Sequence, residues 1–243
     1  MEYSQRDMMC RLPKAQHVDR TEFLRKCARA KLVIHVGFVD TGYELEQRKN
    51  GTWLHQDLAE VAKHIVGVDV NERGIQRAVS DGYEAYCIDL SDPNANTSGL
   101  PMDAGVIIAG EVIEHVENVG AFVRGIASVA SRDTRIVFTT PNSSSIIQAL
   151  LAFGRREVCH PDHVVSFTAS TLVGLLERCG LEVETLATYS SKVRLDTAEG
   201  GGKLLAMGGR IALFFERTAA RFVSPYVASG LIVTARKSSL NLI

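Results

Sequence analysis

The sequence has few of the residues that hold small extracellular folds together. Its five cysteines are an odd number, lie far apart along the chain and include no Cys-x-x-Cys pair. This usage argues against a disulfide framework and against a zinc knuckle. We therefore expect a protein of a reducing compartment, namely a cytoplasmic one.

Long hydrophobic runs are missing as well. The most apolar stretch, Leu204–Phe215, is interrupted by two glycines and Arg210, whereas a helix that crosses a bilayer needs about 20 apolar residues. The N-terminus carries acidic and basic residues where a secretory signal has its apolar centre. We therefore expect neither a membrane-spanning segment nor export.

An excess of charge of one sign is also missing. The 27 Lys and Arg residues nearly balance the 28 Asp and Glu residues, which leaves a formal net charge of −1. Without a basic field, a nucleic-acid partner is not expected. The 46% of hydrophobic residues and the six prolines are typical of a globular chain. We expect one domain that spans residues 1–243.

Short β-branched apolar runs alternate with amphipathic stretches along this chain. Seven of these runs read as strands: Leu32–Val36, Ile65–Val70, Ala85–Ile88, Gly105–Ala109, Arg135–Thr140, Leu181–Leu186 and Leu231–Ala235. Between the first two, Leu54, Leu58 and Val61 recur at helical spacing. The alternation predicts a doubly wound α/β fold, in which a mostly parallel seven-stranded sheet carries helices on both faces.

Two segments lie outside this alternation. We expect residues 1–30 to form an N-terminal helical cap. Residues 200–222 read as an amphipathic insertion whose apolar face contains Leu204, Met207, Ile211, Phe214, Phe215 and Phe222. Three interpretations of the insertion remain open: a lid or internal packing element, a homodimer face, or a membrane surface contact.

Acidic residues end three of the predicted strands. The first strand runs into a glycine loop at residues 37–42, and Asp69, Asp89 and Glu111 follow the next three strands. Ligands of such sheets bind beyond the carboxyl ends of the strands. A carboxylate at the second strand end suits a ribose diol, and one at the third can accept a hydrogen bond from an adenine amino group. These positions predict an adenosine pocket.

The spacing of the glycine loop limits which adenosine cofactor is expected. Gly37 has no glycine two residues later, and Asp69 follows it by 32 residues, whereas a dinucleotide-binding fold places its acid about 20 residues further on. The loop is also not followed by the Gly-Lys-Ser/Thr of a phosphate-binding loop. NAD and ATP are therefore both disfavoured.

Several of these segments together resemble one family. The matching pieces are IHVGFVDTG, IVGVDVN, YCIDLSD, VIIAGEVIEHVENVGAF, IVFTTPN and HPDHVVSFTASTLVGLLERCGLEV. They resemble the class I S-adenosylmethionine-dependent methyltransferases, from about Lys31 to Lys237. The resemblance implies a Rossmann-like methyltransferase that binds S-adenosylmethionine. It also implies the cofactor-binding residues Gly37, Phe38, Val39, Asp40, Asp69, Val70, Asp89, Leu90, Gly110 and Glu111.

The glycine loop departs from the family pattern. His35 stands where most members carry an acid, and Val39 stands where most carry a second glycine. We expect Asp40 to substitute for the missing acid and His35 to be a hydrogen-bonded core residue. For Asp69 the alternative is a helix cap, and for Trp53 both packing and recognition remain open.

A metal site is a further expectation. Glu111, Glu114 and His115 have the spacing i, i+3, i+4, which would put them on one face of a helical turn. With His163 they would form an open site for Mg²⁺ or Mn²⁺. The pattern resembles the Glu-x-x-Glu-His motif of small-RNA 2′-O-methyltransferases and, more loosely, ubiquinone-pathway O-methyltransferases. The alternative is that Glu114 and His115 only brace the pocket wall.

Methylation of a hydroxyl group on a small-molecule or glycan-like acceptor is the expected reaction. Candidate catalytic residues are His163 as the base, His160 as a second base, and His115 and Glu111 beside them. N- or C-methylation, RNA 2′-O-methylation and a non-catalytic scaffold with the same fold remain alternatives.

Overall fold

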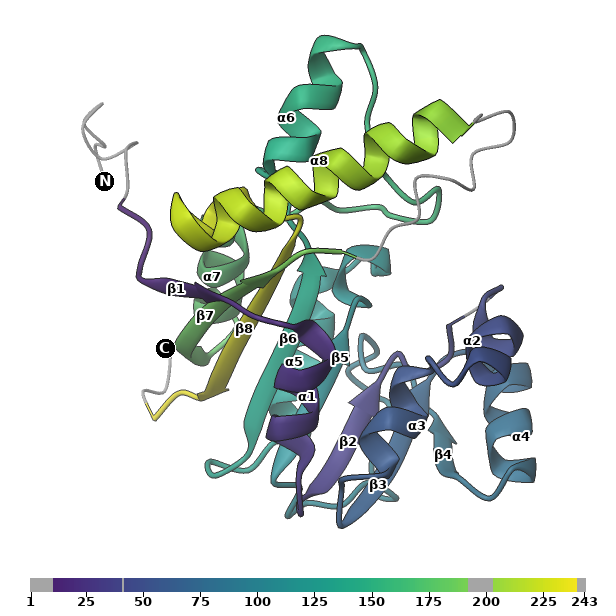
Figure 1. Ribbon diagram of the computed structural model, residues 1–243. Helices are drawn as coiled ribbons and strands as arrows, with labels where there is room; N and C mark the ends of the chain where they lie inside the picture. Colours follow the sequence, from purple (N-terminus) through teal and green to yellow (C-terminus); the bar gives the residue numbers. More distant parts are fainter. Residues whose placement is uncertain (1–10, 41, 192–202, 240–243) are drawn as a thin grey trace.

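The computed structural model describes residues 11–40, 42–191 and 203–239 (Figure 1). Its strands are β1 (Ala15–His17), β2 (Leu32–Val36), β3 (His64–Asp69), β4 (Glu84–Cys87), β5 (Val106–Gly110), β6 (Arg135–Pro141), β7 (Leu181–Tyr189) and β8 (Gly230–Lys237). Its α-helices are α1 (Arg20–Ala28), α2 (Glu44–Asn50), α3 (Leu54–Ala59), α4 (Glu72–Ser80), α5 (Val119–Val129), α6 (Ile146–Phe153), α7 (Ala169–Arg178) and α8 (Lys203–Phe222). Two short 3-10 helices are η2 (Ile113–His115) and η3 (Pro225–Val227).

The strands form one mixed sheet in the order β1-β7-β8-β6-β5-β2-β3-β4. Every neighbouring pair is parallel except the two pairs that involve β8, which runs antiparallel to β6 and β7. The predicted Rossmann-like fold is confirmed, and each of the seven predicted strands is present: β2 has the predicted bounds, and the other six have slightly different ends.

The sequence predicted a helical cap over residues 1–30, but the described part of this segment is not wholly helical. Ala15–His17 instead pairs with β7 as an eighth strand at the sheet edge. A strand of three residues is too short to show the alternation by which strands are recognised. The helical part begins at Arg20, where the side chain of Asp19 accepts a hydrogen bond from the Glu22 N–H. Residues 1–10 lie outside the described chain.

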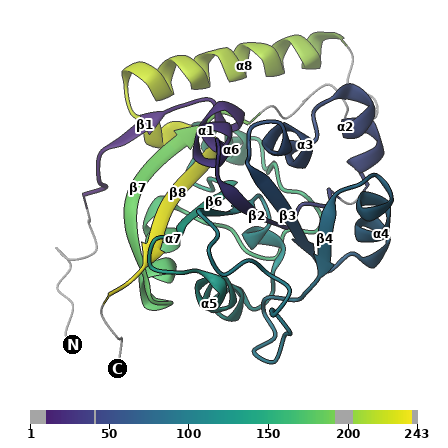
Figure 2. The same cartoon turned by 90° about the horizontal axis from the view of Figure 1, so that it is seen from below.

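The two faces of the sheet carry different helices. Figure 2 shows α1 and α3 on one side of the strands and α5 and α7 on the other. Alternate residues of a strand pack on opposite faces of the sheet, because successive side chains of a strand point in opposite directions. Val33 of β2 packs in the cluster that contains α1 and α3, whereas Ile34 packs in the cluster that contains α5 and α7. This arrangement accounts for the almost continuous apolar sequence of the central strands.

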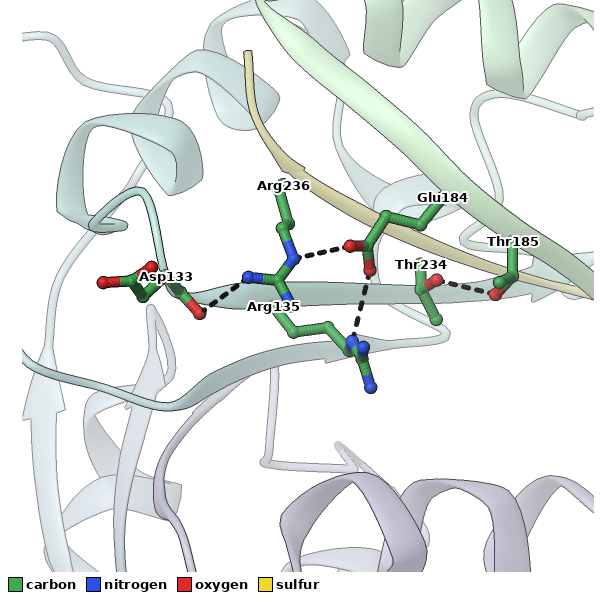
Figure 3. Close-up of polar contacts among 6 residues, drawn as sticks. All are labelled: Asp133, Arg135, Glu184, Thr185, Thr234 and Arg236. Atoms are coloured by element: carbon green, nitrogen blue, oxygen red, sulfur yellow. Dashed lines mark hydrogen bonds and ion pairs between the residues drawn. The ribbon is translucent and has the colours of Figure 1, made fainter. Parts of the chain in front are cut away.

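Glu184 explains how the antiparallel strand β8 is held near the amino end of the parallel strand β6. The pairing of β7 with β8 shifts register between Val183 and Thr185, which leaves Glu184 at a bulge. Its carboxylate accepts hydrogen bonds from Nε of Arg135 in β6, at 3.3 Å, and from Nε of Arg236 in β8, at 2.5 Å (Figure 3). One carboxylate therefore joins three adjacent strands.

The predicted amphipathic insertion is the helix α8, although residues 200–202 lie outside the described chain. It runs along the outside of the molecule, at the end of the sheet where the parallel strands finish (Figure 1). Glu216 attaches it there: its side chain is 1% exposed, and its Oε1 accepts hydrogen bonds from the Ser229 N–H and hydroxyl at 2.8 and 2.9 Å. This bond pair fixes which face of α8 meets the protein.

Candidate active site

The loops after β2, β3, β4 and β5 meet at one edge, because these strands are parallel neighbours. Gly37 begins the first loop with a φ of +67°, a conformation that favours glycine. A Cβ atom at this position would lie 2.4 Å from Cγ2 of Val112, which follows β5. The glycine therefore allows the β2 loop to pass directly over the β5 loop.

Asp69 ends β3 and connects the same loops. Its Oδ2 accepts a hydrogen bond from the Val39 N–H at 2.9 Å, and its Oδ1 accepts from the N–H groups of Val70 and Asn71 at 2.8 and 2.9 Å. The cap of α4 is Asn71, whose side chain bonds the Gly74 N–H. The alternative of Asp69 as the helix cap is therefore wrong, and its carboxylate instead fixes the glycine loop.

The other predicted cofactor residues divide into two groups. The side chains of Phe38, Val39 and Leu90 are buried in hydrophobic clusters. Val70 is 64% exposed, and Asp89 is exposed with its Oδ1 accepting bonds from the N–H and hydroxyl of Ser91. Val70 and Asp89 can therefore touch a ligand with their side chains, whereas the buried three can offer only backbone groups.

His35 is a core histidine, as expected. It is 2% exposed, and its Nδ1 lies 3.1 Å from Nδ1 of the fully buried His55, with the two rings stacked. Burial holds the pKa of His35 well below its usual range and lowers that of His55 to about 3. Trp53 packs beside them and donates from Nε1 to the Phe38 carbonyl at 3.0 Å, which assigns it to packing.

Arg20 is a site residue that the sequence analysis missed. It comes from α1, yet its Nε donates to the Thr139 hydroxyl of β6 at 3.0 Å and its Nη2 lies 3.7 Å from Oε2 of Glu111. A Cβ at Gly110 would lie 2.9 Å from this guanidinium. No sequence signal marks Arg20, because every one of these contacts is made across the fold.

Tyr189 is the second residue that was missed. It ends β7, three residues beyond the predicted strand, and its hydroxyl donates to Oε1 of Glu111 at 2.6 Å. The run Ala187-Thr188-Tyr189 continues the strand pattern and could have revealed it.

Burial raises the pKa of Asp40 to about 6, although the nearby charge of Arg20 opposes this change. The edge thus combines a cation, a phenol and two carboxylates.

The expected helical face of Glu111, Glu114 and His115 does not form. Glu111 has a φ of +56°, outside the helical region, and the helical turn η2 begins only at Ile113. The carboxylate of Glu111 is instead held by Tyr189 and Arg20. A backbone in the left-handed conformation is strained for this residue type, and such strain clusters at functional sites.

Three imidazoles lie together beside this edge: His115, His160 and His163. Among the described residues, these three histidines form a group in which one ring nitrogen of each lies within 4.8 Å of one ring nitrogen of the other two. His163 is held next to η2, since the N–H groups of Val164 and Val165 donate to the Glu114 carbonyl. Burial lowers the pKa of His115 and of His163, and the neighbouring imidazoles lower them further.

The imidazole group contacts Tyr43, the residue that follows the glycine loop. The ring of Tyr43, which follows that loop, makes an edge contact with His160 at a centroid distance of 6.2 Å. Sequence reasoning had given His160 only as a second base, but the structure makes it a full member of the group. His160 therefore connects the histidines from η2 and from the chain after α6 to the residue that follows the glycine loop.

A small pocket with polar and apolar walls is lined in part by His163. Its walls include Glu114, Thr140, Ser143, Gln148 and His163. Glu114 is 1% exposed, and neither of its carboxyl oxygens has a hydrogen-bond partner in the described part of the chain. Burial, with a smaller contribution from Glu111, raises the pKa of Glu114 to about 8. A neutral carboxyl group at this pocket can donate a hydrogen bond to a ligand.

The convergent group does not fit the expected magnesium or manganese site. Mg²⁺ and Mn²⁺ prefer oxygen ligands, whereas the group that converges within the described residues offers only imidazole nitrogens. Glu111 and Glu114 lie outside it, the first held by Tyr189 and the second facing the pocket. Of the predicted two-glutamate, two-histidine ligand set, this structure brings together His115 and His163 with His160 and leaves the two glutamates outside the group.

A family model described as "Methyltransferase domain" matches residues 49–186, which is more than half of the chain. Curated proteins gave no significant match.

The fold is shared with solved methyltransferase structures. A SAM-dependent methyltransferase from Archaeoglobus fulgidus has 16% identity and a TM-score of 0.52, with 89% of this chain and 92% of that chain covered. Magnesium protoporphyrin IX methyltransferase from Synechocystis, with bound SAH, has 14% identity and a TM-score of 0.53 over 90% and 80%. The small RNA methyltransferase HEN1 has 17% identity and a TM-score of 0.54, over 91% of this chain but 25% of that one.

The family model covers the chain from the end of α2 into β7. The chain belongs to the methyltransferase domain family, the S-adenosylmethionine-dependent class I methyltransferases.

Proposed function

We propose that this protein transfers the methyl group of S-adenosylmethionine to a hydroxyl group of a small-molecule or glycan-like acceptor. The observation that carries the proposal is His163: it belongs to the imidazole group that contacts Tyr43, the residue that follows the glycine loop, and it also lines the small pocket with Glu114. A base at that junction could take the proton of a hydroxyl group while the methyl group is transferred.

The residues at the strand ends fit this cofactor. The carboxylate of Asp69 is fixed by three backbone N–H groups, and its Oδ2 would accept a further hydrogen bond from a ribose hydroxyl group. Val70 offers an exposed apolar surface next to it for the adenine ring, with Asp89 at the neighbouring strand end. When bound, S-adenosylmethionine supplies a methyl group that its sulfonium already activates.

Arg20 suits the amino-acid end of the same cofactor. Its guanidinium reaches Gly110 and Glu111 at the end of β5, and the neighbouring strand β2 leads into the glycine loop. An arginine binds a carboxylate with two parallel hydrogen bonds, so Arg20 would hold the methionine carboxylate. Asp40, whose pKa is raised by burial and partly lowered again by the nearby charge of Arg20, would face the methionine ammonium.

Hydroxyl methylation is favoured over amine methylation by the presence of a base. A neutral amine already offers a lone pair, but a hydroxyl group must lose its proton as the new bond forms. The lowered pKa of His163 keeps its imidazole neutral near pH 7 and able to accept that proton. Glu114, which is uncharged below a pH of about 8, would donate a hydrogen bond to a water molecule or a single hydroxyl group in the small pocket.

The proposal can be tested with defined probes. S-adenosylmethionine with a deuterated methyl group is incubated with a panel of phenols, catechols and glycosides, and mass spectrometry locates the transferred methyl. We expect O-methyl products, together with a loss of about 10²- to 10⁴-fold in kcat for His163→Ala. The matched control is His64→Ala, at the opposite end of β3.

Other outcomes would assign a different function. A methyl group found on nitrogen or carbon would contradict O-methylation, and methylated RNA oligonucleotides would point to an RNA acceptor. A folded protein that fails to bind S-adenosylmethionine in calorimetry would be a scaffold. If activity is lost on exhaustive chelation and regained with a divalent cation, a metal ion rather than a histidine base activates the acceptor.

A further inference from the structure

The helix α8 presents an apolar face to solvent. Ile211, Phe214, Phe215 and Phe222 recur at intervals that place them on one side of the helix. They are 49%, 67%, 65% and 78% exposed. An amphipathic helix on a globular protein normally buries this face, so the orientation of α8 requires an explanation.

Packing of the opposite side accounts for this orientation. Glu216 and Ala220 are each 1% exposed and lie against the protein. The two hydrogen bonds from Ser229 to Glu216 hold that side in place. A rotation of α8 that buried its phenylalanines would expose Ala220 and break both bonds. The outward apolar face is therefore a fixed feature of the fold.

The helix α6 extends the same kind of surface. Seven of its eight residues are apolar and none of them is buried. Leu150 is 58% exposed and Phe153, at its end, is 90% exposed. The two helices contact each other, as Figure 1 shows. The α6–α8 surface comprises Leu150, Phe153, Ile211, Phe214, Phe215 and Phe222.

The charges that border the α6–α8 surface are basic. Arg217 and Arg221 are exposed on α8, and Arg155 and Arg156 are exposed directly after α6. Among the described side chains of α8, the single acid, Glu216, is buried. Beyond α6, Glu157 is the nearest exposed acid along the chain. Aromatic side chains flanked by arginines match the composition of helices that lie in the interface of anionic membranes.

A second copy of the chain fits this surface less well. In a two-fold symmetric dimer the same patch would meet itself, and the arginines of one copy would approach those of the other. An anionic lipid surface would instead neutralise them. Charge complementarity therefore favours an anionic lipid surface over a second copy of the chain.

We propose that the α6–α8 surface is a peripheral docking site for a membrane that contains anionic phospholipids. The phenylalanines enter the headgroup region while Arg155, Arg156, Arg217 and Arg221 meet lipid phosphates. No helix among the described residues is long and apolar enough to cross a membrane. The surface lies at the end of the sheet to which the parallel strands lead, so docking would turn the candidate active site toward the lipid (Figure 1).

Vesicle flotation tests this inference and needs no acceptor or methyl transfer. The full chain is mixed with phosphatidylcholine vesicles that either contain or lack phosphatidylglycerol. We expect flotation only with the anionic vesicles, and weaker flotation at high salt. Phe214→Ser/Phe215→Ser should weaken binding by about tenfold or more. Arg217→Gln/Arg221→Gln should weaken it by roughly fivefold for each charge removed.

Matched controls replace exposed residues elsewhere. Val79→Ser on α4 and Arg178→Gln on α7 should bind as the unaltered protein does. Circular dichroism checks that each variant is folded. Equal flotation of all variants, or no flotation of the unaltered protein, overturns the proposal. A dimer in size-exclusion chromatography that is lost in Phe214→Ser/Phe215→Ser overturns it in favour of a self-association face.

Discussion

The hydroxyl of Tyr189 donates a 2.6 Å hydrogen bond to Oε1 of Glu111, although 78 positions separate the two residues. The bond links the end of β7 to the end of β5 across the intervening strands β8 and β6. It also holds the one residue of the β5 loop that adopts a left-handed backbone. The carboxylate of Glu111 is thereby fixed at the carboxyl end of β5.

Loss of this bond should weaken the fold. Tyr189→Phe keeps the ring but removes the donor, and a hydrogen bond to a charged group contributes about 1.5–3 kcal/mol. We expect a loss at the lower end of this range, because the Glu111 side chain is 38% exposed. Urea unfolding measures it. Tyr86→Phe, which removes an exposed bond to Glu84, should change little, and equal losses in both variants would contradict the assignment.

Gly37 should tolerate no side chain. Gly37→Ala adds strain of roughly 1–2 kcal/mol for the left-handed backbone and about 1–3 kcal/mol for the collision with Val112. Gly82→Ala is the matched control, since Gly82 has a φ of +89° and open space around its Cβ position. The difference between the two variants in thermal unfolding isolates the collision. Gly37→Ala/Val112→Ala should recover part of the loss; no recovery would place the cause elsewhere.

Arg20 should recognise the carboxylate of the cofactor. Calorimetry compares S-adenosylhomocysteine, which has this carboxylate, with adenosine, which lacks it. Arg20→Gln should weaken the binding of S-adenosylhomocysteine by about 10- to 100-fold, because a charge-assisted hydrogen bond is lost. Adenosine binding should be unchanged, and Arg25→Gln on the same helix should affect neither ligand. An equal loss for both ligands would mean that Arg20 only supports the fold.

The His35–His55 pair should make the fold sensitive to acid. Burial lowers the pKa of His55 to about 3 and that of His35 well below its ordinary value of 6.5. Below pH 6.5 the unfolded chain therefore binds protons that the folded chain does not, and the free energy of unfolding falls as the pH falls. Between pH 6.5 and 5 the expected loss is about 1.6 kcal/mol for His55, and His35 adds to this loss.

Nuclear magnetic resonance separates this pair from other acid-sensitive groups. The ring signals of His35 and His55 should keep their neutral positions down to pH 5, whereas titration of either ring with a midpoint near 6.5 would contradict the prediction. His55→Phe should reduce the loss of stability between pH 6.5 and 5, as measured by urea unfolding at each pH.

The local pattern of the chain was enough to predict much of the fold. Buried parallel strands leave continuous apolar runs, so the ranges from Leu32–Val36 to Leu231–Ala235 could be recognised in the sequence. The acids at the strand ends followed from the same periodicity, because a strand end fixes where the next side chains emerge. The edge strand Ala15–His17 could not be recognised, since three residues carry no period.

The tertiary structure decided how the site is completed. Arg20 and Tyr189 reach Glu111 from segments that are distant in sequence, and no local pattern encodes such contacts. The spacing of Glu111 and Glu114 suggested a shared helical face, but the left-handed backbone at Glu111 removed it. The sequence determined the seven longer strands and their approximate ends, because those depend on neighbouring residues. Packing of the whole chain determined the edge strand β1 and which side chains meet at the strand ends.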